Sequence, residues 1–266
     1  MNKKDVYELH QRLNADDPFQ VMAQIRVDTY NQSQGKDDGT GIQCDDCNNR
    51  GDLAFLDESG FFTVRPCKCA GTRLTVLRLQ KQGLYEAAKS KTLPAFRTDT
   101  EMRKTLKNLV RNFLNEEESC WMILCGQSGT GKTHLCTAAF VRLSFDRGVD
   151  GRYLQWISDG RRMKAAAKDG DERMLNDFKN CNLLYIDDLF KCKRDSEPSD
   201  ADIRLAFEIL DYRYSHKLMT IISTEMMLED IRDLDEAIYR RIHEMCGCYI
   251  GNIGRDSNKC YVPGRT

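Results

Sequence analysis

The chain has 266 residues, of which 41% are hydrophobic and 30% charged, and its formal net charge is −1. This length allows one large domain or two modest domains with a sizeable apolar core. The balanced charge excludes a polycationic coat for nucleic acid, although a local basic groove remains compatible with it. The sequence contains neither an apolar run of membrane-spanning length nor the apolar segment of a secretory signal. We therefore expect no membrane contact and a cytoplasmic location.

Two short helices are predicted near the start of the chain, over residues 5–13 and 18–30. The second is preceded by Asp17, a favourable N-cap, and begins with Pro18 at the first helical position. Residues 31–41 are polar and rich in glycine, which predicts a flexible tether to the next module.

Four of the twelve cysteines are grouped in two pairs, Cys44 and Cys47 in CDDC and Cys67 and Cys69 in CKC. Apolar residues on both sides of a turn at residues 58–60 predict a hairpin that brings the two pairs together. Four thiolates are typical of a closed, structural Zn²⁺ site. Free thiols are the alternative, because C-x-C is less diagnostic than a second C-x-x-C. We expect most of the other cysteines to be small core residues in a reducing compartment.

A helix is predicted over residues 72–82 and is closed by Gly83. Residues 89–96 are predicted to be a linker, because Pro94 disfavours a continuous helix there. Another helix is predicted over residues 101–114, where apolar side chains recur at helical spacing.

Residues 126–133 read GQSGTGKT, between an apolar stretch predicted as a strand and a predicted helix. Glycines in this G-x-x-x-x-G-K-[ST] pattern let the backbone N–H groups face the phosphate oxygens of a nucleotide. We expect Lys132 to reach the β- and γ-phosphates and the Thr133 hydroxyl to bind Mg²⁺. The predicted ATP-binding residues are Gly126, Gln127, Ser128, Gly129, Thr130, Gly131, Lys132, Thr133 and His134.

Residues 182–190 read NLLYIDDLF, an apolar strand that ends in two carboxylates. In P-loop ATPases, one carboxylate at this position holds Mg²⁺, and a neighbour orients or deprotonates the attacking water. We assign Asp187 to the metal and Asp188 to the water. An Asp-Asp turn that merely closes a core strand is the alternative, which the preceding P-loop disfavours.

Strands and helices alternate through the rest of the chain. Strands are predicted over residues 152–157, 219–223 and 249–253, and helices from Asp159, from Asp200 and over residues 235–245. This alternation predicts an α/β fold, in which helices flank a parallel sheet.

Cationic residues close to aromatic ones are candidates for contact with single-stranded DNA. Arg161, Arg162 and Lys164 follow Trp156, and Arg213 lies in a stretch rich in tyrosine. The solvated face of a helix has the same composition, so both interpretations stay open.

The order of these motifs resembles the DnaC/DnaI-type bacterial helicase loaders of the AAA+ class, including phage relatives. The resemblance rests on CDDC and CKC, GQSGTGKTHL, LLYIDDLF, LDYRY followed by MTIIST, and DEAIYRRIHEMC. It implies a zinc-binding, helicase-docking domain over residues 1–95 and an AAA+ ATPase domain over residues 96–266 that lacks a C-terminal helical lid. The implied function is ATP-dependent delivery of a hexameric replicative DNA helicase onto single-stranded DNA by an ATPase domain that self-associates.

The resemblance also implies two further catalytic residues. Arg241 matches the arginine finger, which stabilises the charge that develops on the γ-phosphate in a neighbouring subunit's site. Arg240 is the adjacent candidate. Alternatively, both arginines are solvent-exposed residues of a helix without a catalytic role. Thr224 lies at the family's sensor position and is expected to contact the γ-phosphate or its water, with Glu225 as the alternative.

Two other classes of function compete with the helicase loader. An IstB-type transposition helper shares the ATPase core, but the cysteine pairs ahead of that core argue against it. A small-molecule P-loop kinase would carry an arginine-rich lid over the phosphates, and the sequence offers no convincing one.

Overall fold

The computed structural model describes residues 18–116, 118, 120–192 and 196–254. The helix expected over residues 5–13 lies outside this range. The chain divides into two compact units, one that ends at Arg78 and one that begins at Leu79.

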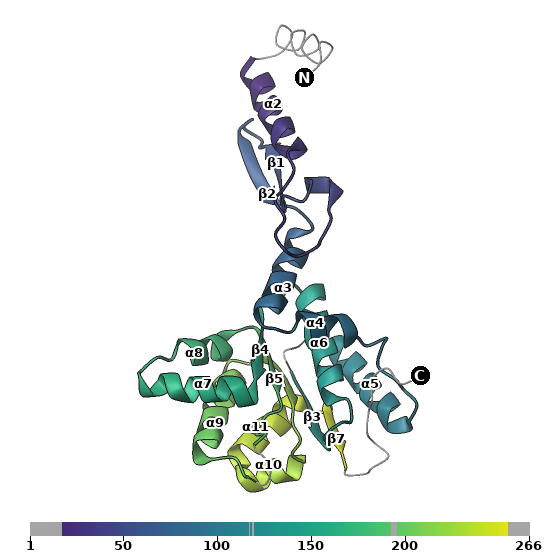
Figure 1. The fold of residues 1–266 in the computed structure, drawn as a ribbon, viewed down its shortest axis with the longest axis vertical. Coiled ribbons are helices and arrows are strands. Elements are labelled where there is room, and N and C mark those ends of the chain that lie inside the picture. Colours follow the sequence, from purple (N-terminus) through teal and green to yellow (C-terminus); the bar gives the residue numbers. More distant parts are fainter. Residues whose placement is uncertain (1–17, 117, 119, 193–195, 255–266) are drawn as a thin grey trace. The chain divides into compact units, whose positions relative to one another are not determined.

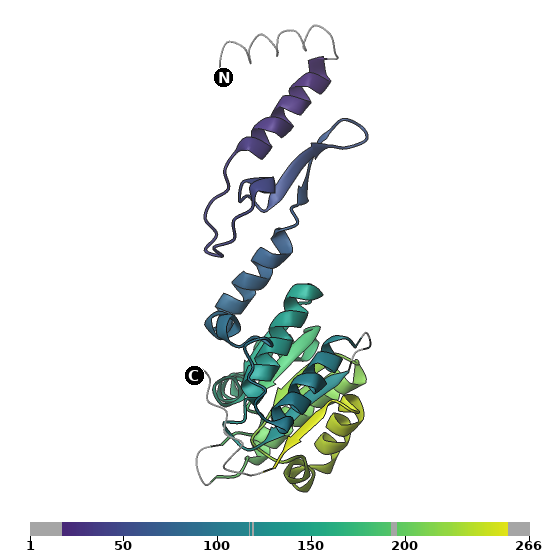
Figure 2. The same cartoon turned by 90° about the vertical axis from the view of Figure 1, so that its right-hand side faces the viewer.

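The first unit consists of a helix, a β-hairpin and the beginning of a second helix. α2 (Pro18–Gln32) packs on the hairpin formed by β1 (Asp52–Leu56) and β2 (Phe62–Pro66), as Figure 2 shows. The turn contains Gly60 at a φ of 79°, a conformation that glycine adopts without strain. After the second cysteine pair the chain enters α3 (Ala70–Lys81). The predicted helix 18–30, the hairpin and the helix 72–82 are therefore all present.

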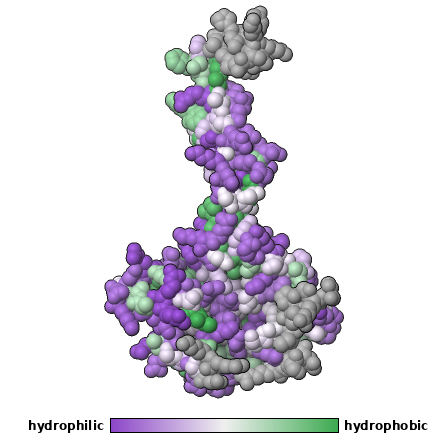
Figure 3. All heavy atoms as spheres, viewed as in Figure 1, coloured by the Kyte–Doolittle hydropathy of each residue, from purple (hydrophilic) through white to green (hydrophobic). Residues whose placement is uncertain are grey.

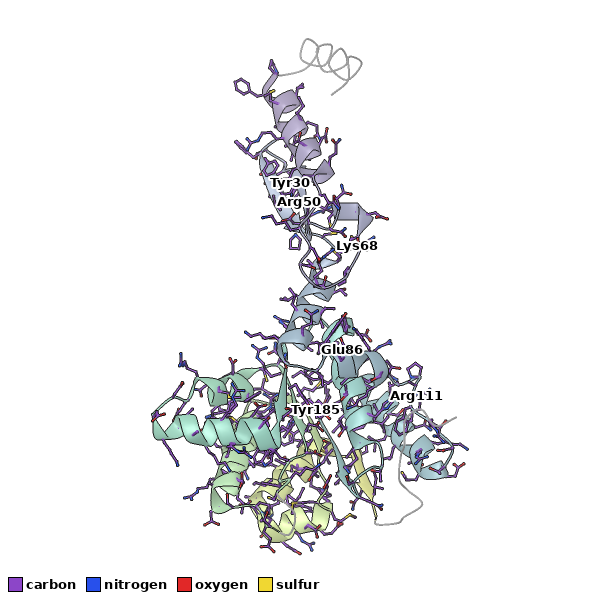
Figure 4. All side chains as sticks on the ribbon, viewed as in Figure 1. Tyr30, Arg50, Lys68, Glu86, Arg111 and Tyr185 are labelled. Carbon is purple, nitrogen blue, oxygen red and sulfur yellow. The ribbon has the colours of Figure 1, made fainter. Side chains whose placement is uncertain are left out.

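Aromatic contacts fasten α2 to the hairpin. The ring of Tyr30 meets Phe62 edge to face, with the ring centroids 5.5 Å apart. The guanidinium carbon of Arg50 lies 3.7 Å from the centroid of Tyr30, and Figure 4 labels both residues. Such contacts contribute about 0.5–1.5 kcal/mol each, which matters in a unit with a small apolar core.

Residues 31–41 are not the flexible tether that their composition predicted. The side chain of Asn31 exchanges hydrogen bonds of 2.9 Å with both backbone groups of Ala54 in β1. At the other end of the segment, Asp38 accepts a hydrogen bond of 2.8 Å from the buried Arg73. The partners that hold this segment are distant in sequence, so its local polarity does not reveal them.

A five-stranded sheet forms the centre of the second unit, with the strand order β4-β5-β6-β3-β7 and parallel pairing throughout. β3, β5 and β6 are buried along their whole length, so their sequences are apolar runs without alternation. The strands are β3 (Trp121–Gly126), β4 (Gly151–Gln155), β5 (Leu183–Asp187), β6 (Met219–Ser223) and β7 (Ile250–Ile253).

Helices cover both faces of this sheet, as Figure 1 shows, and an apolar cluster lies under each layer. The α/β fold predicted from the alternation of elements is thus confirmed. Among the described residues, no helix combines the length and the apolar character needed to cross a membrane. One layer contains α4 (Tyr85–Ser90), α5 (Glu101–Leu114) and α6 (Lys132–Asp146), and the other α7 (Trp156–Lys168), α8 (Arg173–Asn180), α9 (Asp200–Ser215), α10 (Leu228–Leu234) and α11 (Glu236–Cys246).

Three of these helices, α4, α8 and α10, were not predicted from the sequence. They contain 6, 8 and 7 residues, which is too short for a helical period to stand out from its surroundings. β7 is the last element in the described part of the chain. Most of the surface of the second unit that faces the viewer in Figure 3 is hydrophilic.

The boundary between the units lies inside α3, between Arg78 and Leu79, instead of at residue 95. Leu79, Leu84 and Phe96 are 2–3% exposed and belong to the apolar cluster beneath α5 and α6. The helical pattern does stop before Pro94, since α4 ends at Ser90. The segment is nevertheless not a linker, because its apolar side chains pack in the core of the second unit.

Arg213 of α9 is fully buried, which rules it out as a contact for DNA. Its guanidinium donates to the carbonyl oxygens of Phe178, Cys181 and Met219 at 2.6–3.0 Å, and its Nε donates to the Thr220 hydroxyl at 2.9 Å. The residue joins α8, α9 and β6. Its tyrosine-rich surroundings reflect packing, and the DNA interpretation of Arg213 is wrong.

Candidate nucleotide site and cysteine cluster

The P-loop connects β3 to α6. Gly126, Gly129 and Gly131 have φ angles of 104°, 72° and 94°, in the left-handed region that favours glycine. A Cβ added at Gly126 would lie 2.0 Å from the carbonyl oxygen of Ile253 in β7, so no larger residue fits there. The loop leads directly into the first turn of α6, whose positive end stabilises a bound anion.

Two side chains from the first turn of α6 hold the loop and the edge of the sheet. Lys132 Nζ donates to the carbonyl oxygens of Gly126 and Gln127 at 2.6 and 2.7 Å, and burial lowers the pKa of this lysine. Thr133 Oγ1 donates to Asp187 Oδ1 at 3.1 Å. The structure therefore brings together the predicted phosphate-binding lysine and the two predicted Mg²⁺ ligands.

The other predicted loop residues divide by burial. Thr130 is fully buried, and its hydroxyl donates to the carbonyl oxygen of Gln127 at 3.0 Å, which stiffens the loop. Ser128 and Gly129, by contrast, are exposed.

Asp187 ends β5, and its carboxylate accepts hydrogen bonds from four hydroxyl groups. Thr133, Tyr185 and Ser223 donate to Oδ1 at 2.6–3.1 Å, and Tyr153 donates to Oδ2 at 2.9 Å. Tyr185, labelled in Figure 4, belongs to β5, while the other donors come from α6, β6 and β4. Burial raises the pKa of both tyrosines, so they remain donors at neutral pH. Four elements therefore orient this carboxylate.

The sequence offered one signal for these tyrosines. Tyr185 and Asp187 are two residues apart in a strand and therefore share a face of the sheet. No such signal points to Tyr153. This residue lies near Asp187 because it pairs with Tyr185 in the register between β4 and β5.

Asp188 has a different environment from Asp187. Its φ is 59°, an unfavourable conformation for a residue other than glycine, and its N–H donates to the Ser223 hydroxyl at 3.0 Å. Its carboxylate lies 2.8 Å from Lys191 Nζ, and burial raises its pKa. The two adjacent carboxylates, one held by hydroxyls and one by a cation, have environments that suit different roles.

The geometry does not support the sensor role predicted for Thr224. The residue is fully buried, and its hydroxyl donates to the carbonyl oxygen of Leu189 at 2.8 Å and accepts from the N–H of Met226 at 3.2 Å. Both interactions hold the turn that follows β6. The carboxylate of Glu225, the alternative sensor, pairs with Lys191 Nζ at 2.8 Å.

His134 packs against the segment before α5. Its Nε2 lies 2.8 Å from the carbonyl oxygen of Thr92, and its ring meets Phe96 edge to face at 5.2 Å. The residue is 6% exposed, and burial lowers its pKa. These contacts give it a structural role and do not support its predicted contact with the nucleotide.

The two arginines of α11 have different surroundings. Arg241 Nε donates to Asp211 of α9 at 2.8 Å, and its guanidinium carbon lies 4.7 Å from the centroid of Phe207. The side chain of Arg240 is 74% exposed and pairs with Glu236 one turn earlier at 2.7 Å. Contacts within the chain thus hold the predicted finger Arg241, and the adjacent Arg240 is the one that extends into solvent.

Of the α7 cations considered for DNA, two are paired with carboxylates. Lys164 Nζ lies 2.5 Å from Asp202 of α9, and Arg162 lies 3.2 Å from Asp159. These ion pairs favour the interpretation of α7 as a solvated helix with charged neighbours.

The four cysteines predicted to bind zinc come together in the first unit. Their sulfur atoms all lie within 4.8 Å of one another, with Cys44 and Cys67 at 3.8 Å and Cys47 and Cys69 at 3.6 Å. Tetrahedral Zn–S bonds of about 2.3 Å place sulfurs about 3.8 Å apart, whereas a disulfide brings them to about 2.05 Å. The arrangement therefore fits a Zn²⁺ ion held by four thiolates.

Hydrogen-bond donors surround this cluster. The N–H of Gly51 lies 3.3 Å from the sulfur of Cys47, and Arg73 Nε donates to the sulfur of Cys69 at 3.3 Å. Donors of this kind orient metal ligands and stabilise thiolate charge. Arg73, which sequence reasoning missed, therefore links the cluster to the segment that contains Asp38.

Comparison with known proteins identifies the second unit. The family described as IstB-like ATP binding protein matches residues 78–245, most of the chain. The chain belongs to this family. It is 36% identical to Uncharacterized protein YqaM of Bacillus subtilis over 134 residues, or 50% of this chain, and the match spans only 42% of YqaM. It is 26% identical to Phage-like element PBSX protein XkdC of the same species over 80% of this chain and 83% of XkdC.

Solved structures place the same unit among AAA+ proteins. The DnaC helicase loader matches with a TM-score of 0.54 and 25% identity, over 64% of this chain and 97% of that chain. DnaI matches with a TM-score of 0.51 and 20% identity, over 65% of this chain and 92% of that chain, which shows a shared fold. The predicted AAA+ fold and the resemblance to DnaC-type proteins are confirmed.

Proposed function

We propose that this chain is an ATP-dependent helicase loader. Its second unit binds and hydrolyses ATP with Mg²⁺ and self-associates. Its first unit, which contains the four-cysteine cluster, binds zinc and docks on a hexameric replicative DNA helicase. Cycles of ATP binding and hydrolysis deliver that helicase onto single-stranded DNA. The observation that carries the proposal is the presence of a four-cysteine cluster ahead of an AAA+ unit similar to the DnaC helicase loader over 97% of that chain.

The site residues divide the chemistry among themselves. The P-loop N–H groups and Lys132 bind the phosphates, and Thr133 and Asp187 hold Mg²⁺, which supplies charge neutralisation at the phosphates. Asp188, next to this metal site, orients or deprotonates the attacking water. The transposition helper and the small-molecule kinase give no role to the cysteine cluster, which lies before the matched residues 78–245.

The test of the proposal is complex formation with the replicative helicase of the organism that carries the gene. We expect the full chain and the hexameric helicase to elute together on size exclusion with light scattering, and the mixture to unwind DNA that the helicase alone does not enter. Lys132→Ala is the matched control, because it impairs the ATP site and leaves the first unit untouched. It should still form the complex but should not load the helicase.

The proposal is wrong if the wild-type chain forms no complex with the helicase with or without ATP. Stimulation of a transposase by the chain, without any effect on a helicase, would favour the transposition helper instead.

The exposed Arg240 is the better candidate for a finger that enters a neighbouring subunit's site. We expect Arg240→Ala to bind ATP normally but to hydrolyse it about 10³-fold more slowly, because a guanidinium supplied in trans stabilises the transition state. Mixing it with Asp188→Asn should restore part of the activity in composite sites. Steady-state hydrolysis across mixing ratios provides the measurement.

Arg241→Ala is the matched control on the same helix. Because Arg241 pairs with Asp211 and lies over Phe207, its loss should lower the Tm and change the hydrolysis rate less. The opposite result would be normal hydrolysis by Arg240→Ala together with an inactive but stable Arg241→Ala. That result would identify Arg241 as the arginine finger.

A further inference from the structure

Lys191 lies in the tight turn that follows β5. Its N–H donates to the carbonyl oxygen of Asp188 at 2.9 Å, and Asp188 and Phe190 have φ angles of 59° and 62°. Packing holds this disfavoured backbone, since Phe190 is 3% exposed and its ring meets Trp156 edge to face at 5.6 Å. The turn therefore presents Lys191 in a defined position beside Asp188.

The ammonium group of Lys191 bridges two carboxylates. Its Nζ lies 2.8 Å from Asp188 Oδ2 and 2.8 Å from Glu225 Oε1. Burial acts to lower the pKa of Lys191, but the hydrogen bonds to both carboxylates outweigh it and raise that pKa, so the group stays charged. Burial acts to raise the pKa of Glu225, but its interactions with Lys191 and with Ser128 of the P-loop lower that pKa.

Lys191 also changes the net charge of the groups around the proposed nucleotide site. Burial lowers the pKa of Lys132, the predicted phosphate-binding lysine, and the nearby carboxylates of Glu225 and Asp188 act in the opposite direction. Asp187, Asp188 and Glu225 carry three formal negative charges, and Lys132 and Lys191 carry two positive charges, which gives a net charge of −1. Without Lys191 the net charge would be −2, with two carboxylates lacking their counter-ion.

We propose that Lys191 is a specificity-determining residue that lets this site accept the γ-phosphate and so favours ATP over ADP. The inference rests on the proposed ATP site and assigns its triphosphate preference to one side chain. The P-loop lysine contacts the β- and γ-phosphates, so charge close to it acts most strongly on the terminal phosphate, which ADP lacks. Lys191 neutralises two carboxylates that would otherwise repel that phosphate.

The experiment measures the binding of AMPPCP and ADP, each with Mg²⁺, to the full chain by titration calorimetry. We expect Lys191→Met to weaken AMPPCP binding about tenfold and ADP binding less than about twofold, in the range of partly buried ion pairs. Lys191→Arg keeps the charge and should retain both affinities. The double variant Lys191→Met with Glu225→Gln returns the net charge to −1 and should recover most of the AMPPCP affinity.

Lys164→Met is the matched control. Lys164 is 34% exposed and pairs with one carboxylate on α9, while Lys191 is 33% exposed, so both changes remove a similar half-buried cation. The control should alter neither affinity. Equal losses for both nucleotides in Lys191→Met, unchanged AMPPCP binding, or a failure of Lys191→Arg to retain affinity would each overturn the inference. If the proposed ATP site itself is wrong, the wild-type chain will bind neither nucleotide.

Discussion

Removal of zinc is expected to unfold the first unit and leave the second unit folded. Outside the cysteine cluster, the described part of the first unit buries few apolar side chains, among them Val21, Val27, Ala54 and Val76. Four thiolates on zinc supply roughly 10–16 kcal/mol that is available only to the folded form, more than so small a core provides. The second unit has its own apolar clusters on both faces of the sheet. Metal analysis should find one zinc per chain, and a chelator should abolish one thermal transition without changing ATP affinity.

A matched pair of cysteine variants separates metal binding from general loss of a thiol. Cys67 is buried in the cluster, whereas Cys248 is exposed and lies in the second unit. We expect Cys67→Ser to lose zinc and the helicase complex but to keep ATP binding, and Cys248→Ser to keep all three. Absence of zinc from the wild-type protein would refute the metal site. A Cys67→Ser protein that binds the helicase with wild-type affinity would refute the docking role.

Asp188→Asn is expected to bind ATP and Mg²⁺ but to hydrolyse ATP about 10²–10⁴-fold more slowly. The change removes a group placed to orient or deprotonate water. It leaves Asp187, with its four hydroxyl donors, to hold the metal. Steady-state hydrolysis and calorimetric ATP binding, measured on the same preparation, check both halves of the expectation.

Lys132→Ala provides the contrast for Asp188→Asn. Because Lys132 is the predicted phosphate-binding side chain, this variant should lose affinity for ATP itself. Hydrolysis by Asp188→Asn at the wild-type rate, with normal binding, would show that another group activates the water.

Much of the candidate nucleotide site was predictable because its residues lie in short stretches of chain. Gly126, Gly129 and Gly131 lie in a single loop, and Asp187 and Asp188 are adjacent at the end of one strand. The spacing within each stretch is enough to predict which groups would face the phosphates and the metal of a bound nucleotide. The two cysteine pairs were predictable for a similar reason, since a short hairpin joins them.

The errors occur where a residue's role depends on partners that are far away in sequence. Arg213 is a cation in a stretch rich in tyrosine, but it is buried among carbonyl groups of distant segments. Thr224 matched the sensor position by order alone, and its hydroxyl is used by the neighbouring turn. Residues 31–41 appeared free because Asn31 and Asp38 find their partners in β1 and α3.

By itself the sequence determined the class of fold, the P-loop, the pair of aspartates and the cysteine pairs, because each depends on local spacing or on the alternation of strands and helices. Only the tertiary structure decided which side chains surround Asp187, which arginine of α11 reaches solvent, and that Lys191 bridges Asp188 and Glu225. The physical reason is that the parallel sheet places the ends of β4, β5 and β6 side by side through crossover connections. Residues from distant segments therefore meet at one edge, and no local pattern records which of them do so.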